Sequence, residues 1–407
     1  MDHSPLLDQC RQAVPEILSL TERLVNMDSG SDDIPGLERK AALLERLFTG
    51  LGAEVRLVES PAPGSAARNV VATFRGEGTA RILILTHYDT VFPAGEAARR
   101  PFARDAERAY GPGVADMQAS IAMLLVGLPL FHAVSGRPYH TLTVFCNAEE
   151  ETGSPGSREV IRALAAGHHM ALNMELSGAA GELITVSGRG MANGTLTVRG
   201  KAAHSAAEPP AGVNAGLELA HQLLQLRDLS RPDIRTSVSI TMGRFGTKPN
   251  VIPDSAEALL NIRVARHEEF ARVEEEIRRR IRNRLFPESG VGFSMRIVFE
   301  PYGNTPEILE LADRVRDMAR EELGLELGYR HAIGSNDTSF SSECCPSLDG
   351  FGPGCVGMHS VDEYLPIATV APRLYLLLRT LQEICAGRFV PFRRLACDGD
   401  EGDGDAR

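Results

Sequence analysis

The stretch Arg81–Thr90 constrains the fold of this chain more than any other. Within it, residues 82–85 form a continuous run of strand-forming apolar residues, which is typical of a strand buried on both faces of a parallel sheet. The run ends near His87 and Asp89, which lie two residues apart and so share one face of an extended chain. Ligands bind at the carboxyl ends of strands in open α/β sheets, and a metal-binding imidazole commonly gives its other N–H to a carboxylate. An isolated His-x-Asp is more often a plain strand end, so the rest of the chain decides between the two interpretations.

Strands alternate with helices around this stretch. The periodicity predicts strands at 55–58, 69–74, 81–86, 141–146 and 170–174, and helices within 15–51 and at 118–132, 155–166 and 371–386. This alternation predicts an α/β domain with a mostly parallel sheet. Beyond Thr185 the order becomes strand, helix, strand, strand, helix, strand, at 195–199, 214–226, 237–241, 257–264, 268–284 and 293–299. That order predicts a smaller α+β domain of the ferredoxin-like type with an antiparallel sheet.

The length of 407 residues favours two domains, because single hydrophobic cores stop growing near this size. We expect a catalytic domain at 1–187 plus 301–390, interrupted by an inserted domain at 188–300. The Gly- and Asp-rich tail at 391–407 is expected to be disordered.

Composition excludes several classes of protein. The net charge of −11 argues against a nucleic-acid partner, and 43% hydrophobic and 24% charged residues are ordinary for a soluble globular chain. The longest apolar run, Ile121–Phe131, is too short to cross a bilayer and predicts a core helix. The N-terminus shows no signal-peptide pattern, and the seven Cys include no Cys-x-x-Cys pair, so we expect a reduced, cytoplasmic protein without a membrane partner.

Polar residues recur where the predicted strands end or in the loops that follow. They are His87 with Asp89, Asp116, Glu149 to Glu151, Glu175 and His359. Alone, each has an ordinary explanation: an aspartate before an apolar helix is usually its N-cap, and a run of glutamates is usually a solvated loop. Together, several carboxylates at one sheet edge would repel one another and need a cation. Two histidines with carboxylates and no cysteine suit zinc, and would accept manganese or cobalt.

Ordered motifs from about Leu24 to Leu381 resemble those of the dinuclear-zinc aminoacylase and glutamate carboxypeptidase family of metallopeptidases, the carboxypeptidase G-like group. The matching stretches are Thr86–Thr90, Gly111–Met117, Asn147–Ser154, Met174–Glu175, Gly200–Ser205, Gly212–Ala215, Asn250–Pro253, Asn261–Arg263 and Gly357–Ser360. Because so many motifs match in order, the resemblance is specific where each motif alone is not.

The resemblance implies a role for each polar residue. Asp116 would bridge two metal ions, with His87 and Glu175 completing the first site and Glu151 and His359 the second. Asp89 would orient His87, and Glu150 would be the general base toward the attacking water. Three glutamates run together, so Glu149 stays an alternative to Glu150 for that base.

The resemblance also assigns substrate recognition to the inserted domain. His204 would reach the active site of the other subunit of a homodimer and stabilise the oxyanion. Arg263, with Asn250 lying near it, would bind a substrate carboxylate. From the residues alone, a surface turn for His204 and a surface ion pair for Arg263 remain open.

Two stretches depart from the family pattern. Gln118-Ala119-Ser120 replaces a Lys-Gly-Gly after the bridging aspartate, and the Gly-rich loop appears as Ile333–Thr338. We therefore predict a dinuclear metal-dependent hydrolase that cleaves the amide C–N bond of a small N-acyl amino acid or dipeptide-like substrate with a free carboxylate. The alternatives are an aminohydrolase that releases ammonia from an aromatic or small amine, and a non-catalytic relative that binds a metabolite.

Overall fold

The computed structural model describes residues 4–59, 68–207 and 211–388, so the tail predicted to be disordered lies outside the described residues. The chain divides into two compact units. The first unit comprises Met1–Ser187, Gly303–His331 and Asn336–Arg407, and the second comprises Gly188–Tyr302 and Ala332–Ser335. Each unit is described by itself below.

A six-stranded sheet forms the centre of the first unit. Its order is β1 (Glu54–Glu59), β2 (Arg68–Arg75), β6 (Tyr139–Asn147), β3 (Ala80–His87), β7 (Met170–Asn173) and β17 (Ser347–Leu348). The β6–β3, β3–β7 and β7–β17 pairs are parallel, whereas β1–β2 and β2–β6 are antiparallel. The apolar run predicted to be a buried central strand is β3, in which Ile82, Leu83, Ile84 and Leu85 are fully buried. The prediction of an α/β fold with a mostly parallel sheet is confirmed.

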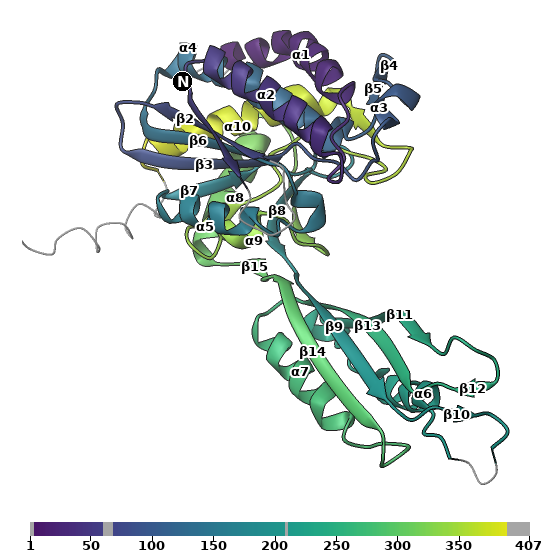
Figure 1. Cartoon of the computed structure of the whole chain (residues 1–407). Coiled ribbons are helices and arrows are strands. Elements are labelled where there is room, and N and C mark those ends of the chain that lie inside the picture. Colours follow the sequence, from purple (N-terminus) through teal and green to yellow (C-terminus); the bar gives the residue numbers. More distant parts are fainter. Residues whose placement is uncertain (1–3, 60–67, 208–210, 389–407) are drawn as a thin grey trace, which may run out of the picture. The chain divides into compact units, whose positions relative to one another are not determined.

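Helices cover this sheet (Figure 1). They are α1 (Ser4–Val25), α2 (Ile34–Gly50), α3 (Glu96–Arg99), α4 (Ala119–Ser135), α5 (Ser157–Ala166), α8 (Pro306–Leu323), α9 (Thr338–Ser341) and α10 (Val370–Cys385). The apolar run predicted to be a core helix lies in α4, which packs against α1 and α10. The segment Val114–Ser135 is long and apolar enough to cross a membrane, but 72% of its most apolar window is buried inside this unit. It is a core helix.

Shorter elements complete the first unit. They are β4 (Ala103–Arg104), β5 (Arg108–Tyr110), β8 (Leu183–Gly188), β15 (Tyr302–Gly303), β16 (Gly328–Ala332) and β18 (Tyr364–Pro366), of which β8 and β16 reach the boundary with the second unit and β15 straddles it. Strand β18 pairs with β5, which brings the loop before Tyr364 beside the loop after Tyr110. Two of the predicted ligand positions, Asp116 and His359, belong to these two loops.

The second unit is a four-stranded antiparallel sheet with two helices. The sheet order is β11 (Ser237–Phe245), β13 (Ser255–Val264), β9 (Gly190–Arg199) and β14 (Gly290–Phe299), and the helices are α6 (Ala215–Leu226) and α7 (Glu268–Arg280). Alternate residues of β13 are buried, from Ala256 to Val264, and cluster with the apolar faces of both helices. The predicted α+β class is confirmed. A two-stranded sheet of β10 (Ala203–His204) and β12 (Val251–Ile252) adjoins it.

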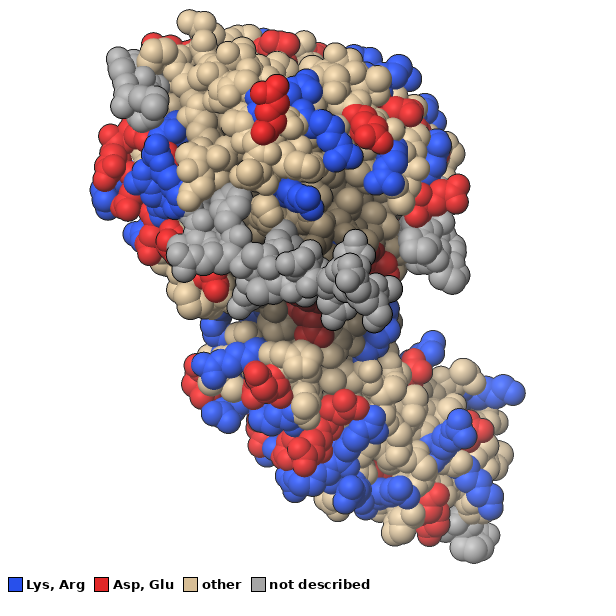
Figure 2. Space-filling view, turned by 90° about the vertical axis from the view of Figure 1, so that its left-hand side faces the viewer, with Lys and Arg blue, Asp and Glu red and all other residues tan. Residues whose placement is uncertain are grey.

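Charges of both signs are interspersed on the face shown in Figure 2, where no stripe of one sign runs across either unit. On α7, for example, Arg278 pairs with Glu274 and Arg279 with Glu276. Such paired charges form a solvated helix face, not the uncompensated basic patch that a nucleic-acid phosphate backbone attracts.

Candidate metal centre

His87 is the last residue of β3 and is almost fully buried, with 1% exposure. Its Nδ1 lies 3.3 Å from Oδ1 of Asp89, and its Nε2 lies 3.1 Å from Oδ1 of Asp116. Burial opposes the charged imidazolium, but hydrogen bonds to Asp116 and Asp89 outweigh it and raise the pKa of His87 well above its usual value. One nitrogen therefore faces an orienting carboxylate, and the other faces the centre of the site.

Asp116 lies between the two histidines. Its Oδ1 faces Nε2 of His87 at 3.1 Å, and its Oδ2 faces Nε2 of His359 at 3.2 Å. Burial would raise the pKa of Asp116, but the hydrogen bonds from His359 and His87 hold it well below its usual range. A carboxylate whose two oxygens face different partners has the geometry of a bridging ligand.

The three consecutive glutamates separate in the structure. Glu149 accepts hydrogen bonds from the backbone N–H groups of Gly156 and Ser157 at 2.7 and 2.6 Å, at the start of α5. Glu150 and Glu151 open a single 3-10 turn, Glu150–Thr152. The carboxylate of Glu151 lies 3.1 Å from Nε2 of His359, and that of Glu150 groups with His87 and Glu175.

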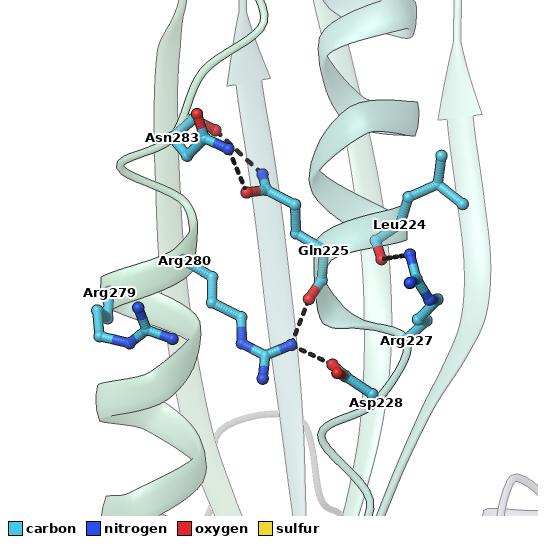
Figure 3. A pocket seen from close by; sticks show the side chains of 7 residues that line it. All are labelled: Leu224, Gln225, Arg227, Asp228, Arg279, Arg280 and Asn283. Atoms are coloured by element: carbon cyan, nitrogen blue, oxygen red, sulfur yellow. Dashed lines mark hydrogen bonds and ion pairs between the residues drawn. The ribbon is translucent and has the colours of Figure 1, made fainter.

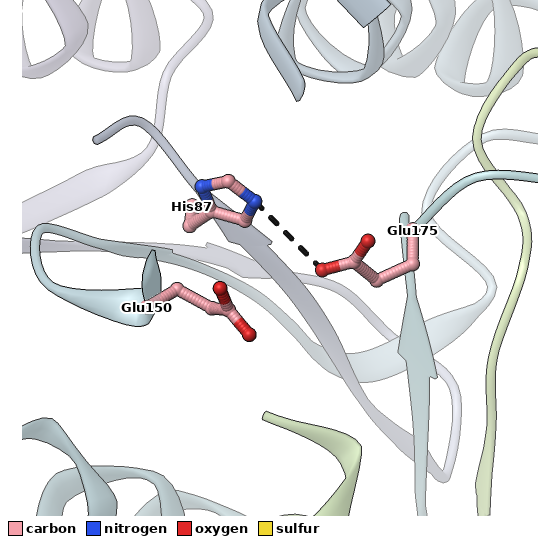
Figure 4. A group of neighbouring side chains, drawn as sticks. All are labelled: His87, Glu150 and Glu175. Atoms are coloured by element: carbon pink, nitrogen blue, oxygen red, sulfur yellow. Dashed lines mark ion pairs between the residues drawn. The ribbon is translucent and has the colours of Figure 1, made fainter. Parts of the chain in front are cut away.

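Glu175 stands two residues after the end of β7. Its Oε1 is 3.7 Å from Nε2 of His87, and Figure 4 shows the carboxylate of Glu150 turned toward the same space from the neighbouring turn. Burial and, after it, the charge of Asp116 raise the pKa of Glu175 well above its usual value. Burial likewise raises the pKa of Glu150, with the charge of Glu175 adding to it.

This donor set fits divalent metal ions. Two groups, His87 with Glu150 and Glu175, and His87 with Asp116 and Glu151, each offer nitrogen and oxygen atoms that lie within 4.8 Å of one another. Imidazole and carboxylate ligands without thiolates are those that zinc and manganese accept. The crowding of buried carboxylates contributes to the raised pKa values of Glu150, Glu151 and Glu175, and a bound cation would relieve it.

Asp89 connects the parts of this centre. It is fully buried, and its two oxygens accept the backbone N–H groups of Glu150 and Glu151 at 3.1 Å each. The hydroxyl of Ser31 donates to the same carboxylate at 2.8 Å. Asp89 thus holds the turn that carries Glu150 and Glu151 at a fixed place beside His87.

Glu363 is a supporting residue that the sequence analysis missed. Its carboxylate accepts the backbone N–H groups of Gly113, Ala115 and Asp116 at 3.0, 3.0 and 3.2 Å. Burial, followed by the charge of Asp116, raises its pKa to about 7. The signal available in the sequence was an acidic residue four positions after His359, which the β18–β5 pairing brings to the Asp116 loop.

The departures from the family pattern have local partners. Gln118 donates to the backbone oxygen of Tyr88 at 3.2 Å, and Ser120 donates to the backbone oxygen of Met174 at 2.8 Å. In the other stretch, Asp337 accepts hydrogen bonds from Asn147 and from the hydroxyl of Ser154. Both stretches support the loops that carry the predicted ligands, and neither removes a ligand.

The predicted substrate-binding residues belong to the second unit, where the structure separates them. The backbone N–H of Ser205 donates to the backbone oxygen of Asn250 at 3.0 Å, so Asn250, the residue before β12, lies close to His204 of β10. Strand β13 begins three residues after β12, and Arg263 is the last residue but one of β13. The eight residue steps from Ser255 to Arg263 span about 26 Å at about 3.3 Å each. Within one chain, the expectation that Asn250 lies near Arg263 is wrong.

Arg263 instead lies among other arginines. Its pKa is lowered by burial and by the charge of Arg189, and the pKa of Arg189 is lowered by burial and by Arg235. Arg189 donates to the backbone oxygen of Arg235 and to the hydroxyl of Ser237, the residue opposite Arg263 on β11. Within the described part of the chain, no carboxylate pairs with Arg189 or Arg263. The sequence analysis missed this cluster because its members are far apart in the chain.

Of two hollows in the surface, one includes a predicted metal ligand and the other does not. The one in Figure 3, between α6 and α7, contains Arg279 and Arg280, which pair with Glu276 and, for Arg280, with Asp228. It includes none of the predicted site residues. The other hollow, in the first unit, has Ser31, Glu151 and Thr152 in its wall and therefore opens beside the metal centre.

Comparisons with known proteins agree with this arrangement. A family model described as a peptidase dimerisation domain matches residues 186–288, and one described as peptidase family M28 matches residues 69–225. Carboxypeptidase G2 from Pseudomonas sp. (strain RS-16) is 29% identical over 92% of this chain and 90% of its own length. Succinyl-diaminopimelate desuccinylase from Delftia acidovorans is 26% identical over 90% of this chain and 97% of its own length.

Solved structures show the same fold. A tripeptidase from Staphylococcus aureus superposes with a TM-score of 0.78 at 19% identity, over 92% of this chain and 99% of its own. The peptidase family model and the curated relatives indicate enzymes that hydrolyse amide bonds. These findings support the family of metallopeptidases that contains carboxypeptidase G2 and succinyl-diaminopimelate desuccinylase, and with it a hydrolase acting on peptides or acyl-amino acids.

Proposed function

We propose that this protein is a dinuclear metal-dependent hydrolase that cleaves the amide C–N bond of a small N-acyl amino acid or dipeptide-like substrate with a free carboxylate. One observation carries the proposal: the two oxygens of Asp116 face different imidazoles, His87 and His359. Each imidazole also has a second carboxylate beside it, Glu175 for His87 and Glu151 for His359. Two half-sites that share one aspartate are what a pair of metal ions requires.

In this proposal His87, Asp116 and Glu175 hold one ion, and Asp116, Glu151 and His359 hold the other. Zinc suits this ligand set best, with manganese and cobalt as the alternatives. When bound, the two ions lower the pKa of a water molecule and stabilise negative charge on the carbonyl oxygen of the substrate. Asp89 keeps the Nδ1 of His87 engaged, so that Nε2 stays directed at the ion.

Glu150 is the proposed general base. Its carboxylate stands within 4.8 Å of His87 and Glu175 ligand atoms, so it can accept a proton from a water at the centre. Its raised pKa favours holding that proton and then passing it to the leaving nitrogen. Glu149 is unsuited to the task because its carboxylate is engaged at the start of α5.

The arginine cluster of the second unit supports a free carboxylate on the substrate. Arg263 and Arg189 are half-buried guanidinium groups with no carboxylate partner among the described residues. A planar guanidinium binds a carboxylate through two parallel hydrogen bonds. We propose that this cluster holds the carboxylate end of the substrate, with Arg263 as the principal contact.

The second unit is also the proposed site of homodimer formation. Its edge strand β11 exposes Ile240, Met242 and Phe245 at 44%, 63% and 62%, and the adjacent α6 exposes Leu217 and Leu224 at 54% and 62%. An exposed apolar edge strand is a hazard unless another strand pairs with it. The match to a peptidase dimerisation domain over residues 186–288 supports the second unit as the part of the chain that dimerises.

His204 and Asn250 would then act across the dimer. Both are exposed on the second unit, and His204 accepts a hydrogen bond from the backbone N–H of Ala206 through its Nδ1. We propose that His204 of one subunit stabilises the oxyanion in the other subunit's site, and that Asn250 supports it. Their separation from Arg263 within one chain is consistent with recognition residues that come from two subunits.

A reduced, cytoplasmic setting is part of the proposal. The six cysteines in the described part of the chain form no disulfide, and burial raises the pKa of the thiol well above its usual value in five of them: Cys10, Cys146, Cys345, Cys355 and Cys385. Buried thiols of this kind are inert packing groups, and a chain of this size does not need disulfides to fold.

Product analysis tests the proposed function. The purified protein, loaded with zinc or manganese, is incubated with N-acyl amino acids, dipeptides, folate-like conjugates and aryl amines, with and without a chelator. Chelator-sensitive release of an amino acid is the expected result. Release of ammonia alone from an amine would instead make the protein an aminohydrolase. Absence of hydrolysis across the panel, with metal bound, would contradict the proposed substrate class.

A further inference from the structure

Lys40 is a buried lysine close to the metal centre that the proposed function does not use. It lies on α2 with 1% exposure, whereas the chain's other lysines, Lys201 and Lys248, are exposed. Its Nζ donates to the hydroxyl of Ser29 at 2.7 Å. Burying an ammonium group is costly unless nearby groups compensate it, so a lysine in this position calls for a physical explanation.

Two carboxylates, those of Asp28 and Asp89, act on the charge of Lys40. Burial lowers its pKa to about 7, while the charges of Asp28 and Asp89 act in the opposite direction. Asp28 is engaged elsewhere, since its carboxylate accepts the backbone N–H groups of Gly95 and Ala97 at 2.8 and 2.9 Å. Asp89 is the other carboxylate whose charge raises the pKa of Lys40, and it belongs to the metal centre.

A short turn links the two residues. The backbone N–H of Thr90 donates to the backbone oxygen of Ser29 at 2.9 Å. The backbone N–H of Ser31 donates to the backbone oxygen of Thr90 at 3.1 Å. Between them, the backbone of Gly30 packs tightly against the segment that follows β3. A Cβ on residue 30 would lie 2.1 Å from the backbone oxygen of Phe92. The hydroxyl of Ser31 then donates to Asp89 at 2.8 Å. Lys40 therefore anchors one end of a turn whose other end holds Asp89.

We propose that Lys40 is a positioning residue of the metal centre: by holding Ser29, it fixes the turn at residues 29–31 that keeps the Asp89 carboxylate against His87. This inference rests on the proposed function only in taking His87 as a metal ligand. The hydrogen bond of the Lys40 ammonium goes to Ser29, which is not one of the proposed ligands. Its effect passes through Asp89, which also receives the backbone N–H groups of Glu150 and Glu151.

The substitution Lys40→Met tests this role, because methionine fills a similar volume without the ammonium group. Zinc affinity is measured by competition with a chromogenic chelator, and the melting temperature is measured alongside. Loss of an outer-shell partner typically weakens metal binding by about 10- to 100-fold, and we expect Lys40→Met to fall in that range. Ser31→Ala, which removes the last hydrogen bond of the same path, should weaken zinc binding in the same direction.

Leu44→Ala is the matched control. Leu44 is fully buried one turn further along α2, and its truncation should lower the melting temperature while leaving zinc affinity at the wild-type value. A Lys40→Met protein that is destabilised but binds zinc as tightly as the wild type would overturn the proposal. If Lys40→Met does not fold, wild-type zinc affinity in Ser31→Ala would overturn it equally. Zinc affinity needs no substrate, so a failed substrate panel with zinc bound would contradict the proposed function and leave this inference standing.

Discussion

Glu149 and Glu150 are adjacent in the chain, yet their carboxylates serve different parts of the molecule. Glu149 accepts three hydrogen bonds at the start of α5, from the backbone N–H groups of Gly156 and Ser157 and from the hydroxyl of Ser157. Glu150 turns to His87 and Glu175 (Figure 4). This difference supports Glu150 as the base, and it gives a matched pair of substitutions.

Glu150→Ala should abolish turnover and leave the metal content near that of the wild type. Removing a general base costs about 10²- to 10⁴-fold in rate. Steady-state kinetics and elemental analysis of the same preparation measure both quantities. Glu149→Gln is the control, and it should lower the melting temperature while retaining most of the activity at low temperature. Loss of metal from Glu150→Ala would show that Glu150 is a ligand.

Asp89→Asn should weaken metal binding by about 10- to 100-fold, because an amide cannot accept all the N–H groups that now converge on this carboxylate. Calorimetric titration of the metal-free protein with zinc measures the change. Asp105→Asn, at an exposed turn of the same unit, is the control and should bind zinc as the wild type does. Unchanged affinity in Asp89→Asn would contradict the orienting role.

The metal-free protein should become less stable as the pH rises above neutrality. Hydrogen bonds to Asp116 and Glu151 raise the pKa of His359 from 6.5 to about 10 in the folded state. A pKa raised on folding stabilises the protein fully below the unfolded value, and this contribution is lost as the pH rises from about 6.5 to about 10. Urea unfolding of chelator-treated protein across this range measures the loss. His359→Gln should flatten the dependence, and an equally steep decline in that variant would argue against His359 as its source.

Met242→Lys should convert the protein to a monomer. The substitution places a charge in the middle of β11, among the exposed apolar residues of the proposed interface. Light scattering at several protein concentrations gives the mass. Val134→Lys, at an exposed apolar residue of the first unit, is the control and should leave the mass unchanged. A Met242→Lys protein that stays dimeric would exclude this surface.

Arg189→Gln and Arg263→Gln should each raise KM for a substrate with a free carboxylate, with less effect on its amide, which lacks that charge. A hydrogen bond to a charged group contributes about 1.5–3 kcal/mol, which corresponds to roughly a 10-fold or greater change. The ratio of kcat/KM for the acid and the amide is the measurement. An exposed arginine of the second unit, Arg244, supplies the control substitution Arg244→Gln.

Much of the fold follows from periodicity. The apolar run before His87 predicted the buried strand β3, and the order of strands and helices after Thr185 predicted the α+β unit. Strand β8 and the first half of β9 were missed, because Gly188, Arg189 and Gly190 interrupt the pattern between two strands. Glycine weakens any strand signal, whereas in the structure Gly190 lies where a Cβ would meet Pro301.

The candidate ligands could be listed from the sequence because each follows a strand or sits in a recognisable loop. Their supports could not. Ser31 acts through a contact with Asp89, 58 positions away, and Lys40 reaches Asp89 only through Ser29 and the turn that follows it, so neither has a local signal in the sequence. Glu363 offers only its position four residues after His359, and its contact with Gly113 spans 250 positions. The prediction that Asn250 lies near Arg263 was wrong for a related reason. Two motifs that are close in the sequence can lie at opposite ends of the strand that connects them.

Anomalous diffraction at the zinc absorption edge, from crystals of the zinc-loaded protein, would show whether Asp116 bridges two metal ions. We expect two peaks, one on each side of the Asp116 carboxylate, with His87 and Glu175 at one and Glu151 and His359 at the other. A single peak, or two peaks of which neither contacts Asp116, would contradict the proposed bridging role.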